Sequence, residues 1–300
     1  MADKGFGDSQ DRPAAVTTPS VSWFPGNMLK ASRRLAGEVR NAHVVLEMRD
    51  ARLPLLSANP ELERLLGTRK RLILLNKAGL AEPARNGAWQ AFFREREQPA
   101  LLLDAETGKG INLIHPAIRR LCEEWSATYR RRGIRPPLPR VMVVGMPNVG
   151  KSTLINRLIR HKTLKTAPTP GLTRSVAWVN LKGRYQLMDS PGLMLPRLEN
   201  PGEALKLGWI GTIRDAAFSK ERLAGALLDF LLENAGEAVG GFYKLAEPYP
   251  REASAILASI AQFRGLLRKG GGPDPVRAAD QVLADFRKGN LGRFTLETPP

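Results

Sequence analysis

The sequence predicts an α/β fold in which a mostly parallel sheet, with helices on both faces, is followed by a small helical domain. Before about residue 200, short apolar runs alternate with longer amphipathic segments, as in strand–helix–strand units. The loop GMPNVGKS at residues 145–152 joins one apolar run to a helical segment, as phosphate-binding loops do. Beyond this part of the chain, apolar residues recur at helical spacing instead.

The individual elements follow from these patterns. The expected strands cover residues 43–48, 71–75, 100–103, 141–144, 175–179 and 185–188. A helix over 153–158 follows the 145–152 loop. In the last third of the chain we expect helices around 223–231, 256–267 and 276–286, with a break at 270–273 and a stop at Gly289.

Composition restricts the class of protein. The chain has 300 residues and a mass of 33.0 kDa, which is enough for about two domains. The formal net charge of +17 indicates a polyanionic partner such as nucleic acid. The single cysteine, Cys122, excludes an internal disulfide and fits a reducing compartment. No apolar run approaches the roughly 20 residues of a membrane span, so we expect no membrane association.

The positive charge lies in the middle of the chain. Residues 1–22 contain 2 basic and 3 acidic side chains and read as a flexible tail. Residues 23–200 contain 31 and 14, whereas residues 201–300 contain 13 and 12. Because the composition also changes at 196–201, we expect a sheet domain over 23–198 and a helical domain over 199–300.

Residues 145–152 match the pattern GxxxxGK[ST] in its usual context between a strand and a helix. Glycines at 145 and 150 let backbone N–H groups surround phosphates at a helix N-terminus. Lys151 would reach the terminal phosphates and serve catalysis there, and the Ser152 hydroxyl would ligate Mg²⁺. The loop therefore predicts a nucleoside triphosphate site.

A second phosphate motif, DSPG at residues 189–192, follows the expected strand 185–188. Asp189 would hold Mg²⁺ through a water, and Gly192 would offer its N–H to the γ-phosphate. Between the two motifs, Thr173 would complete the Mg²⁺ shell when the γ-phosphate is present.

Two loops that precede these motifs have features of a base-reading site. Asn76 would brace loops and touch the base, and the stem of Lys77 would pack over the purine ring. The loop at 104–110 follows another strand, and the Ala105 N–H is its best candidate donor to guanine O6. The residues expected to contact the nucleotide are Asn76, Lys77, Ala78, Gly79, Asp104, Ala105, Asn148, Val149, Gly150, Lys151, Ser152, Thr153 and Gly192.

This order, with base loops first and phosphate loops last, resembles the circularly permuted GTPases, and among them the ribosome biogenesis GTPase A (YlqF) type. WFPGNM at 23–28, DARLPLLSANP at 50–60 and residues 280–296 support the resemblance, which covers about 22–298. It implies a permuted P-loop domain, a cytoplasmic location, GTP and GDP as ligands and Mg²⁺ as cofactor. It also implies binding to a precursor of the large ribosomal subunit, with the helical domain contacting rRNA. We expect a monomer off the ribosome.

Two positions depart from the family's pattern. The family's base loop reads NKxD, but its fourth position here is Gly79. The missing carboxylate would accept from guanine N1–H and the N2 amine, so its loss favours a purine-unselective NTPase as an alternative. Glu82 is a candidate substitute if the loop shifts.

The second departure is Asn27, which replaces the histidine of the family's WFPGH motif and cannot act as a base, although it can orient a water. The position after DSPG is Leu193, which cannot position a water by hydrogen bonding. We therefore expect slow intrinsic hydrolysis that depends on the ribosomal partner. A nucleotide-binding scaffold with little hydrolysis is the alternative.

Asn148 has two interpretations. It occupies the position at which related potassium-dependent GTPases place a K⁺ ligand, and K⁺ there would neutralise transition-state charge. It is equally explained as an amide that braces the loop.

A basic cluster lies between the two halves of the sheet domain. Arg130, Arg131, Arg132 and Arg135 are followed by Arg140, with no acidic residue among them. A solvated linker is the simplest explanation, but the density of arginine favours contact with RNA phosphates.

Overall fold

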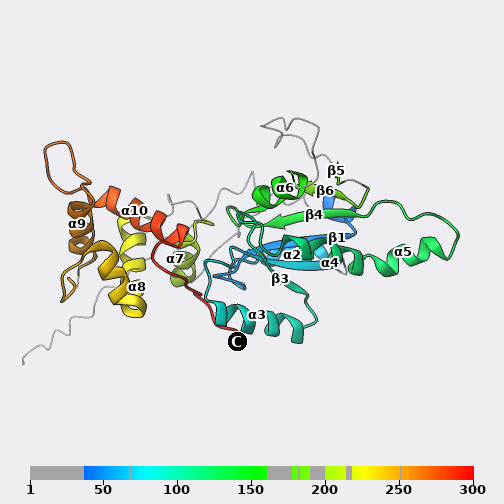
Figure 1. Ribbon diagram of the computed structural model, residues 1–300, viewed down its shortest axis with the longest axis horizontal. Helices are drawn as coiled ribbons and strands as arrows, with labels where there is room; N and C mark the ends of the chain where they lie inside the picture. The colour runs from blue at the N-terminus through cyan, green and yellow to red at the C-terminus, as the bar shows by residue number, and fades with distance from the viewer. Residues whose placement is uncertain are drawn as a thin grey trace, which may run out of the picture.

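The computed structural model describes residues 37–67, 69–160, 178–181, 183–189, 200–213, 218–250 and 252–300. In these ranges a sheet unit and a helical unit lie end to end (Figure 1). The architecture confirms the predicted fold class, a mostly parallel α/β sheet followed by a helical region.

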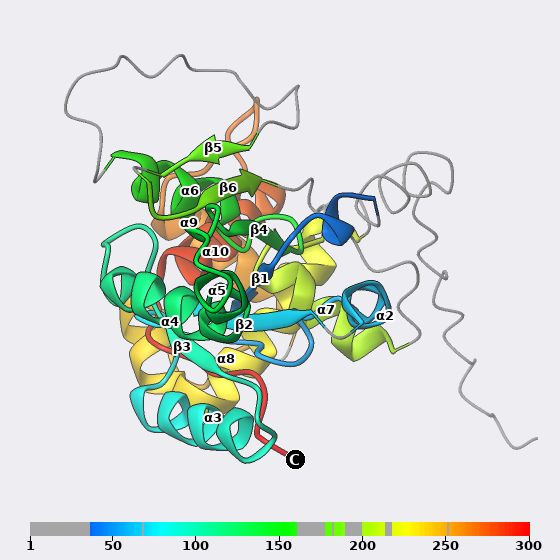
Figure 2. The same cartoon turned by 90° about the vertical axis from the view of Figure 1, so that its right-hand side faces the viewer.

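The sheet has six strands within the described ranges: β1 (Val44–Asp50), β2 (Lys70–Asn76), β3 (Ala100–Leu102), β4 (Arg140–Gly145), β5 (Val179–Asn180) and β6 (Gln186–Asp189). Their order is β3-β2-β1-β4-β6-β5, and Figure 2 shows this order from bottom to top. All neighbours are parallel except β5 and β6. Five of the six expected strands are found; of the strand expected over 175–179, residues 175–177 lie outside the described ranges, and only Val179 belongs to β5.

Helices cover both faces of this sheet, so β1 is buried along its whole length and β4 is buried at every residue after Arg140. One face packs against η1 (Ile111–Leu113), α4 (Ile114–Leu121) and α6 (Lys151–Arg160). The opposite face packs against α2 (Pro60–Leu66) and α3 (Pro83–Glu95). A further helix, α5 (Glu123–Arg130), extends away from the sheet (Figure 1).

The carboxyl ends of the parallel strands meet at one edge, where ligands bind in open α/β sheets. Asp50 pairs in register with Asn76 at the ends of β1 and β2. Gly145 ends the neighbouring strand β4 beside Met48. The topology thus brings the expected base loops and the expected phosphate loop to the same edge of the sheet.

The helical unit contains α7 (Pro201–Trp209), α8 (Lys220–Tyr243), α9 (Ala253–Phe263) and α10 (Pro275–Lys288). The side chains of Asn200, Ser219 and Asp274 accept N–H groups of the first turns of α7, α8 and α10. Gly289, with φ of 81°, ends α10 as predicted. None of the helices in the described ranges is long and apolar enough to cross a bilayer.

The expected helix over 256–267 is too long and is corrected to α9, which ends at Phe263. Gly265 has φ of 66°, a left-handed conformation that stops a helix. Leu267 then forms an antiparallel bridge with Pro273. The helical spacing of Leu267 was therefore coincidental, because this residue lies in the turn between α9 and α10.

The C-terminal segment, defined as residues 291–300, returns from α10 to the sheet unit. The Phe294 N–H donates to the Leu80 carbonyl at 3.0 Å, and the Leu296 N–H donates to the Arg52 carbonyl at 2.9 Å. The segment therefore joins the end of the chain to the loops that follow β1 and β2.

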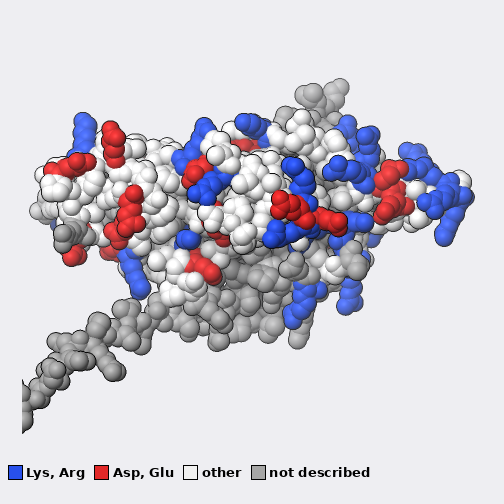
Figure 3. Space-filling view, turned by 90° about the horizontal axis from the view of Figure 1, so that it is seen from below, with Lys and Arg blue, Asp and Glu red and all other residues white. Residues whose placement is uncertain are grey.

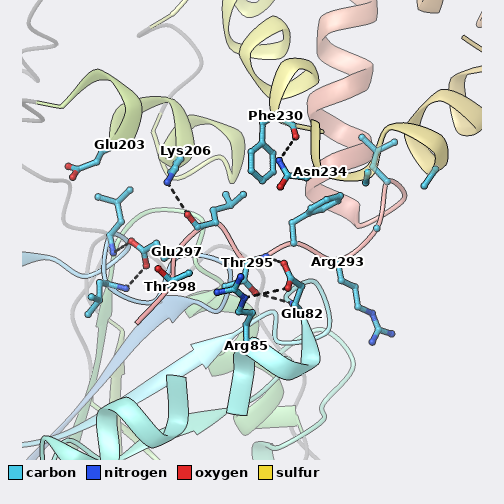
Figure 4. A pocket seen from close by; sticks show the side chains of 18 of the residues that line it. Glu82, Arg85, Glu203, Lys206, Phe230, Asn234, Arg293, Thr295, Glu297 and Thr298 are labelled. Carbon is cyan, nitrogen blue, oxygen red and sulfur yellow. Dashed lines mark hydrogen bonds and ion pairs between the residues drawn. The ribbon is translucent and has the colours of Figure 1, made fainter. Parts of the chain in front are cut away.

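The carboxylate of Glu297 fixes this segment further. It accepts hydrogen bonds from the N–H groups of Leu55 and Leu56, both at 2.8 Å. Lys206 of α7 donates to the Leu296 carbonyl at 2.9 Å. A cavity of about 880 Å³ lies between the segment, α7, α8 and the loops of the sheet unit (Figure 4). The two units are thus connected by polar contacts around this cavity.

A buried ion pair follows β1. Arg52 contacts both carboxylate oxygens of Asp50, with its Nε at 2.9 Å and its Nη2 at 2.8 Å, and both side chains are buried. Burial alone would raise the pKa of Asp50, but the cations of Arg52 and Lys77 and the hydrogen bonds from Arg52 hold that pKa well below its usual range. Asp50 is therefore charged in the folded protein at neutral pH.

We predict that Asp50→Asn lowers the free energy of unfolding by about 3–5 kcal/mol at pH 7, because Arg52 then remains buried without its counter-charge. Urea unfolding followed by circular dichroism measures this loss. Since the folded-state pKa is lowered, the contribution of ionised Asp50 is complete above about pH 4 and is lost as the pH falls below that value.

The control is Asp280→Asn, which removes the half-exposed ion pair with Lys220 and is expected to cost less than about 1 kcal/mol. Equal losses in the two variants, or a difference between wild type and Asp50→Asn that does not become smaller as the pH falls from 4 to 2, would contradict the prediction.

Candidate nucleotide site

The phosphate loop between β4 and α6 has the conformation that its glycines allow. Gly145 has φ of 151°, and a Cβ there would lie 2.4 Å from the Met48 carbonyl oxygen. Gly150 has φ of 101°, and a Cβ there would lie 2.3 Å from Asn76 Nδ2. A side chain at either position would therefore collide with the neighbouring strand or with the base loop.

Three expected phosphate and metal ligands lie at the start of α6. Lys151 Nζ donates to the carbonyls of Gly145 at 3.0 Å and Met146 at 2.7 Å, so its ammonium group lies within the phosphate loop. Ser152 and Thr153 are exposed in the first turn of α6. The Ser152 hydroxyl fits a Mg²⁺ ligand, because it is accessible at the edge where phosphates would bind.

Asp189 ends β6, where its backbone pairs in register with Val143 of the neighbouring strand β4. The backbone of β6 thus ends at the edge of the sheet that carries the phosphate loop, and the role of Asp189 near Mg²⁺ stays a prediction. The side chain of Asp189 lies outside the described residues, as do Asn27, Thr173, Gly192 and Leu193.

Asn76 joins three loops. Its Nδ2 donates to the Val149 carbonyl in the phosphate loop at 2.7 Å, and its Oδ1 accepts from the Ala105 N–H at 2.8 Å. The buried amide thus has the bracing geometry that the sequence predicts. The same bond means that Ala105 already donates its N–H to a protein group, so the suggested contact of Ala105 with guanine O6 would require this bond to break.

Lys77 extends from the base loop towards the phosphate loop. Its Nζ lies 3.1 Å from Asp50 Oδ2 and donates to the Asn148 carbonyl at 2.9 Å. The residue has φ of 59°, a left-handed conformation that is uncommon for a side chain of this kind. Lys77 therefore ties the phosphate loop to the buried ion pair that follows β1.

The rest of the base loop is a tight turn. The Ala78 N–H donates to the Leu103 carbonyl at 3.1 Å, and the Leu80 N–H donates to the Lys77 carbonyl at 2.8 Å. Gly79 is exposed between them. The turn is therefore fixed to β3 on one side and presents position 79 at its surface.

Glu82 does not occupy the place of the missing carboxylate. Its Oε1 accepts from the Thr295 N–H at 3.2 Å, its own N–H donates to the Thr295 hydroxyl at 3.0 Å, and Arg85 lies 3.7 Å from its Oε2 (Figure 4). These contacts hold Glu82 against the C-terminal segment. A loop shift that brought it to the base would break all three.

Asn148 contacts the helical unit. Its Nδ2 donates to the Gly211 carbonyl, just after α7, at 2.7 Å. Arg287 of α10 holds the same turn by donating to the carbonyls of Gly208 and Trp209 at 2.7 and 3.0 Å. The amide nitrogen of Asn148 thus braces the phosphate loop against α7, while its Oδ1 is the atom that K⁺ would require.

Arg157 is a site residue that the sequence analysis did not identify. From α6 it donates to the Glu106 carbonyl in the loop that follows β3, and its guanidinium lies against Gly108. No pattern in the sequence distinguishes this arginine from others on helices. Its contact nevertheless links the helix of the phosphate loop to the second base loop.

The basic cluster begins at Arg130, the last residue of α5, and continues beyond this helix. All four side chains of the cluster are exposed: Arg130, Arg131, Arg132 and Arg135. Arg130 forms an ion pair with Glu123, the first residue of α5. Basic side chains gather at this projecting tip in Figure 3. The cluster is accessible to a large polyanion and far from the carboxyl edge of the sheet (Figure 1).

Comparisons with known proteins agree with this geometry. The model of the 50S ribosome-binding GTPase family matches residues 140–233. Ribosome biogenesis GTPase A of Bacillus cereus is 36% identical over 279 residues, which cover 93% of this chain and 94% of that protein. The chain belongs to the ribosome biogenesis GTPase A family. Mitochondrial ribosome-associated GTPase 1 of Mus musculus is 31% identical to this chain, and the match covers 92% of this chain and 89% of that protein.

Solved structures of the family have the same fold. GNP-bound YlqF from T. maritima is 24% identical, with a TM-score of 0.63, and the match covers 90% of this chain and 98% of that one. The GDP-bound form of the same protein has a TM-score of 0.64. The order of the motifs in this chain is thus the circularly permuted order of the family, with the base loops on β2 and β3 ahead of the phosphate loop on β4.

We predict that Asn76→Ala lowers the affinity for GDP by roughly ten- to a hundredfold, because it removes two buried hydrogen bonds that hold the base loops to the phosphate loop. Titration with a fluorescent GDP analogue measures the affinity. Asn234→Ala is the control, since within the described ranges its amide donates only to the Phe230 carbonyl of the same helix, α8. An unchanged affinity in Asn76→Ala would show that the loops keep their positions without this amide.

Proposed function

We propose that this protein binds and hydrolyses GTP in the cytoplasm as an assembly factor for the large ribosomal subunit. The observation that carries the proposal is the Asn76 amide, which fastens the base loop to a phosphate loop 73 residues further along the chain. A base-reading loop held against a phosphate loop is what a nucleotide site requires. Relatives named as ribosome biogenesis and ribosome-associated GTPases support the ribosomal partner.

The chain's own residues supply the parts of phosphoryl transfer. Lys151 would turn from the loop carbonyls to the terminal phosphates and offset their charge. Ser152, Asp189 and Thr173 would hold Mg²⁺, whose charge stabilises the phosphates when it is bound, and Gly192 would donate its N–H to the γ-phosphate. K⁺ at Asn148 Oδ1 would add a further positive charge.

Two sets of contacts connect the nucleotide-binding loops to the helical unit. Asn148 connects the phosphate loop to the turn after α7, and Leu80 and Glu82 connect the base loop to the C-terminal segment. GTP would stabilise one arrangement of the two units that fits the ribosomal particle, and hydrolysis would release it. The exposed arginines at and beyond the end of α5 would then contact rRNA phosphates together with the helical unit.

We predict that GTP hydrolysis by the isolated protein is slow and rises at least about tenfold with precursors of the large subunit, because Asn27 cannot act as a base and Leu193 cannot position a water by hydrogen bonding. Phosphate release in K⁺ buffer measures the rate, and Na⁺ buffer tests the contribution of K⁺. The affinity for the particle should be higher with a GTP analogue than with GDP.

Other results would favour the alternatives. Equal turnover of ATP and GTP would indicate a purine-unselective NTPase. Binding of GTP without turnover, even on particles, would indicate a scaffold. Equal affinity for the particle with a GTP analogue and with GDP would contradict the proposal that hydrolysis releases the arrangement that fits the particle.

We also predict that Arg131→Gln with Arg132→Gln weakens particle binding and reduces the slope of log affinity against log salt by about 1.5, since each phosphate contact adds roughly 0.7–0.9 to that slope. Sedimentation with particles at several salt concentrations measures it. The matched control, Arg94→Gln with Arg96→Gln, removes the same charge from the last turn and the C-cap of α3. The RNA surface is elsewhere if both double variants have the wild-type slope.

A further inference from the structure

The side-chain carboxylate of Asp104 lies beside Gly79. A Cβ placed on Gly79 would lie 3.4 Å from Oδ2 of Asp104, so a carboxylate at position 79 and that of Asp104 would be immediate neighbours. Asp104 belongs to the second base loop, directly after β3, and β3 pairs with the strand that leads to Gly79. The two base loops therefore converge on the place where this family carries its base-reading aspartate.

The Asp104 side chain is held in this orientation. Its Oδ1 accepts from the N–H groups of Glu106 and Thr107, both at 2.9 Å, and its own N–H donates to the Lys109 carbonyl at 2.9 Å. In the described part of the chain, Oδ2 accepts no hydrogen bond. One oxygen thus anchors the carboxylate to its loop, and the oxygen that faces Gly79 remains available to a ligand.

We propose that Asp104 replaces the missing base-loop aspartate and reads guanine with its Oδ2. The proposal rests on the proposed GTP function and identifies the residue that selects the base. Guanine presents N1–H and the N2 amine as donors, and adenine does not present them in this arrangement. A charge-assisted hydrogen bond from either donor to Oδ2 corresponds to a preference of about ten- to a hundredfold.

The competing carboxylate, Glu82, is held by Thr295 and Arg85 at the C-terminal segment. Asp104 needs no such rearrangement, because its free oxygen already lies beside position 79. The departure at Gly79 is therefore compatible with guanine selectivity.

The test is Asp104→Asn, with binding of GDP, ADP, IDP and XDP measured by calorimetry on the full chain. The asparagine keeps an oxygen for the Glu106 and Thr107 N–H groups and presents an amide donor in place of Oδ2. GDP affinity should fall about ten- to a hundredfold, with ADP affinity unchanged. XDP affinity should rise, since xanthine carries a carbonyl acceptor in place of the guanine amine.

Glu106→Gln is the matched control, because it removes an exposed carboxylate from the same loop and should leave the ratio of GDP to ADP affinity unchanged. Gly79→Asp in the Asp104→Asn background should restore GDP selectivity, and the backbone of Gly79 lies outside the left-handed region and accepts a side chain. This rescue distinguishes base reading from support of the loop.

The proposal is overturned if Asp104→Asn leaves the ratio of GDP to ADP affinity unchanged, or if it weakens all four nucleotides equally. If wild type binds GDP selectively while Asp104→Asn behaves identically, only this inference fails. If wild type binds no guanine nucleotide, the proposed function fails with it.

Discussion

The buried carboxylate of Asp50 is the fixed point around which the loops at the carboxyl edge of the sheet are arranged. It pairs with Arg52, which keeps the turn after β1 in place, and with Lys77, whose ammonium group also contacts the phosphate loop at Asn148. Removing two charges from water is unfavourable unless they are paired and hydrogen-bonded, so this arrangement has little freedom to vary. The first base loop and the phosphate loop therefore share one electrostatic anchor.

The group formed by Asp50, Arg52 and Lys77 is also connected to the helical unit at two places. The Arg52 carbonyl accepts from Leu296 in the C-terminal segment, and its guanidinium lies over the ring of Phe286 in α10. On the other side, Asn148 holds the turn after α7. A ligand that moved Lys77 or the phosphate loop would disturb contacts to both ends of the helical unit. These contacts provide a physical basis for coupling between the bound nucleotide and the arrangement of the two units. They act in addition to the covalent connection of the chain after β6.

The sequence predicted the parts of the fold that depend on local patterns. Buried parallel strands are mostly apolar, and the phosphate loop is a contiguous motif, so both could be located by residue number. It did not predict contacts between distant segments, such as those of Glu297 with Leu55 and Leu56 or of Arg157 with Glu106, because no periodicity encodes them. The end of α9 was misplaced for a related reason, since the spacing of apolar residues does not reveal the left-handed Gly265 or the bridge of Leu267 with Pro273.

Gly79 shows that a residue of a sequence motif can be absent while the chemical group it usually supplies comes from another loop. The base loop after β2 and the loop after β3 leave neighbouring parallel strands at the same edge, so side chains from either loop reach the same volume. The physical requirement of guanine recognition is a fixed, accessible carboxylate oxygen at that point, and either loop can meet it. A sequence motif records only which loop does so in most members of a family. The absence of the NKxD aspartate at position 79 therefore does not imply the loss of guanine selectivity. The carboxylate of Asp104, which its own loop holds in place, faces Gly79 and can meet the same requirement.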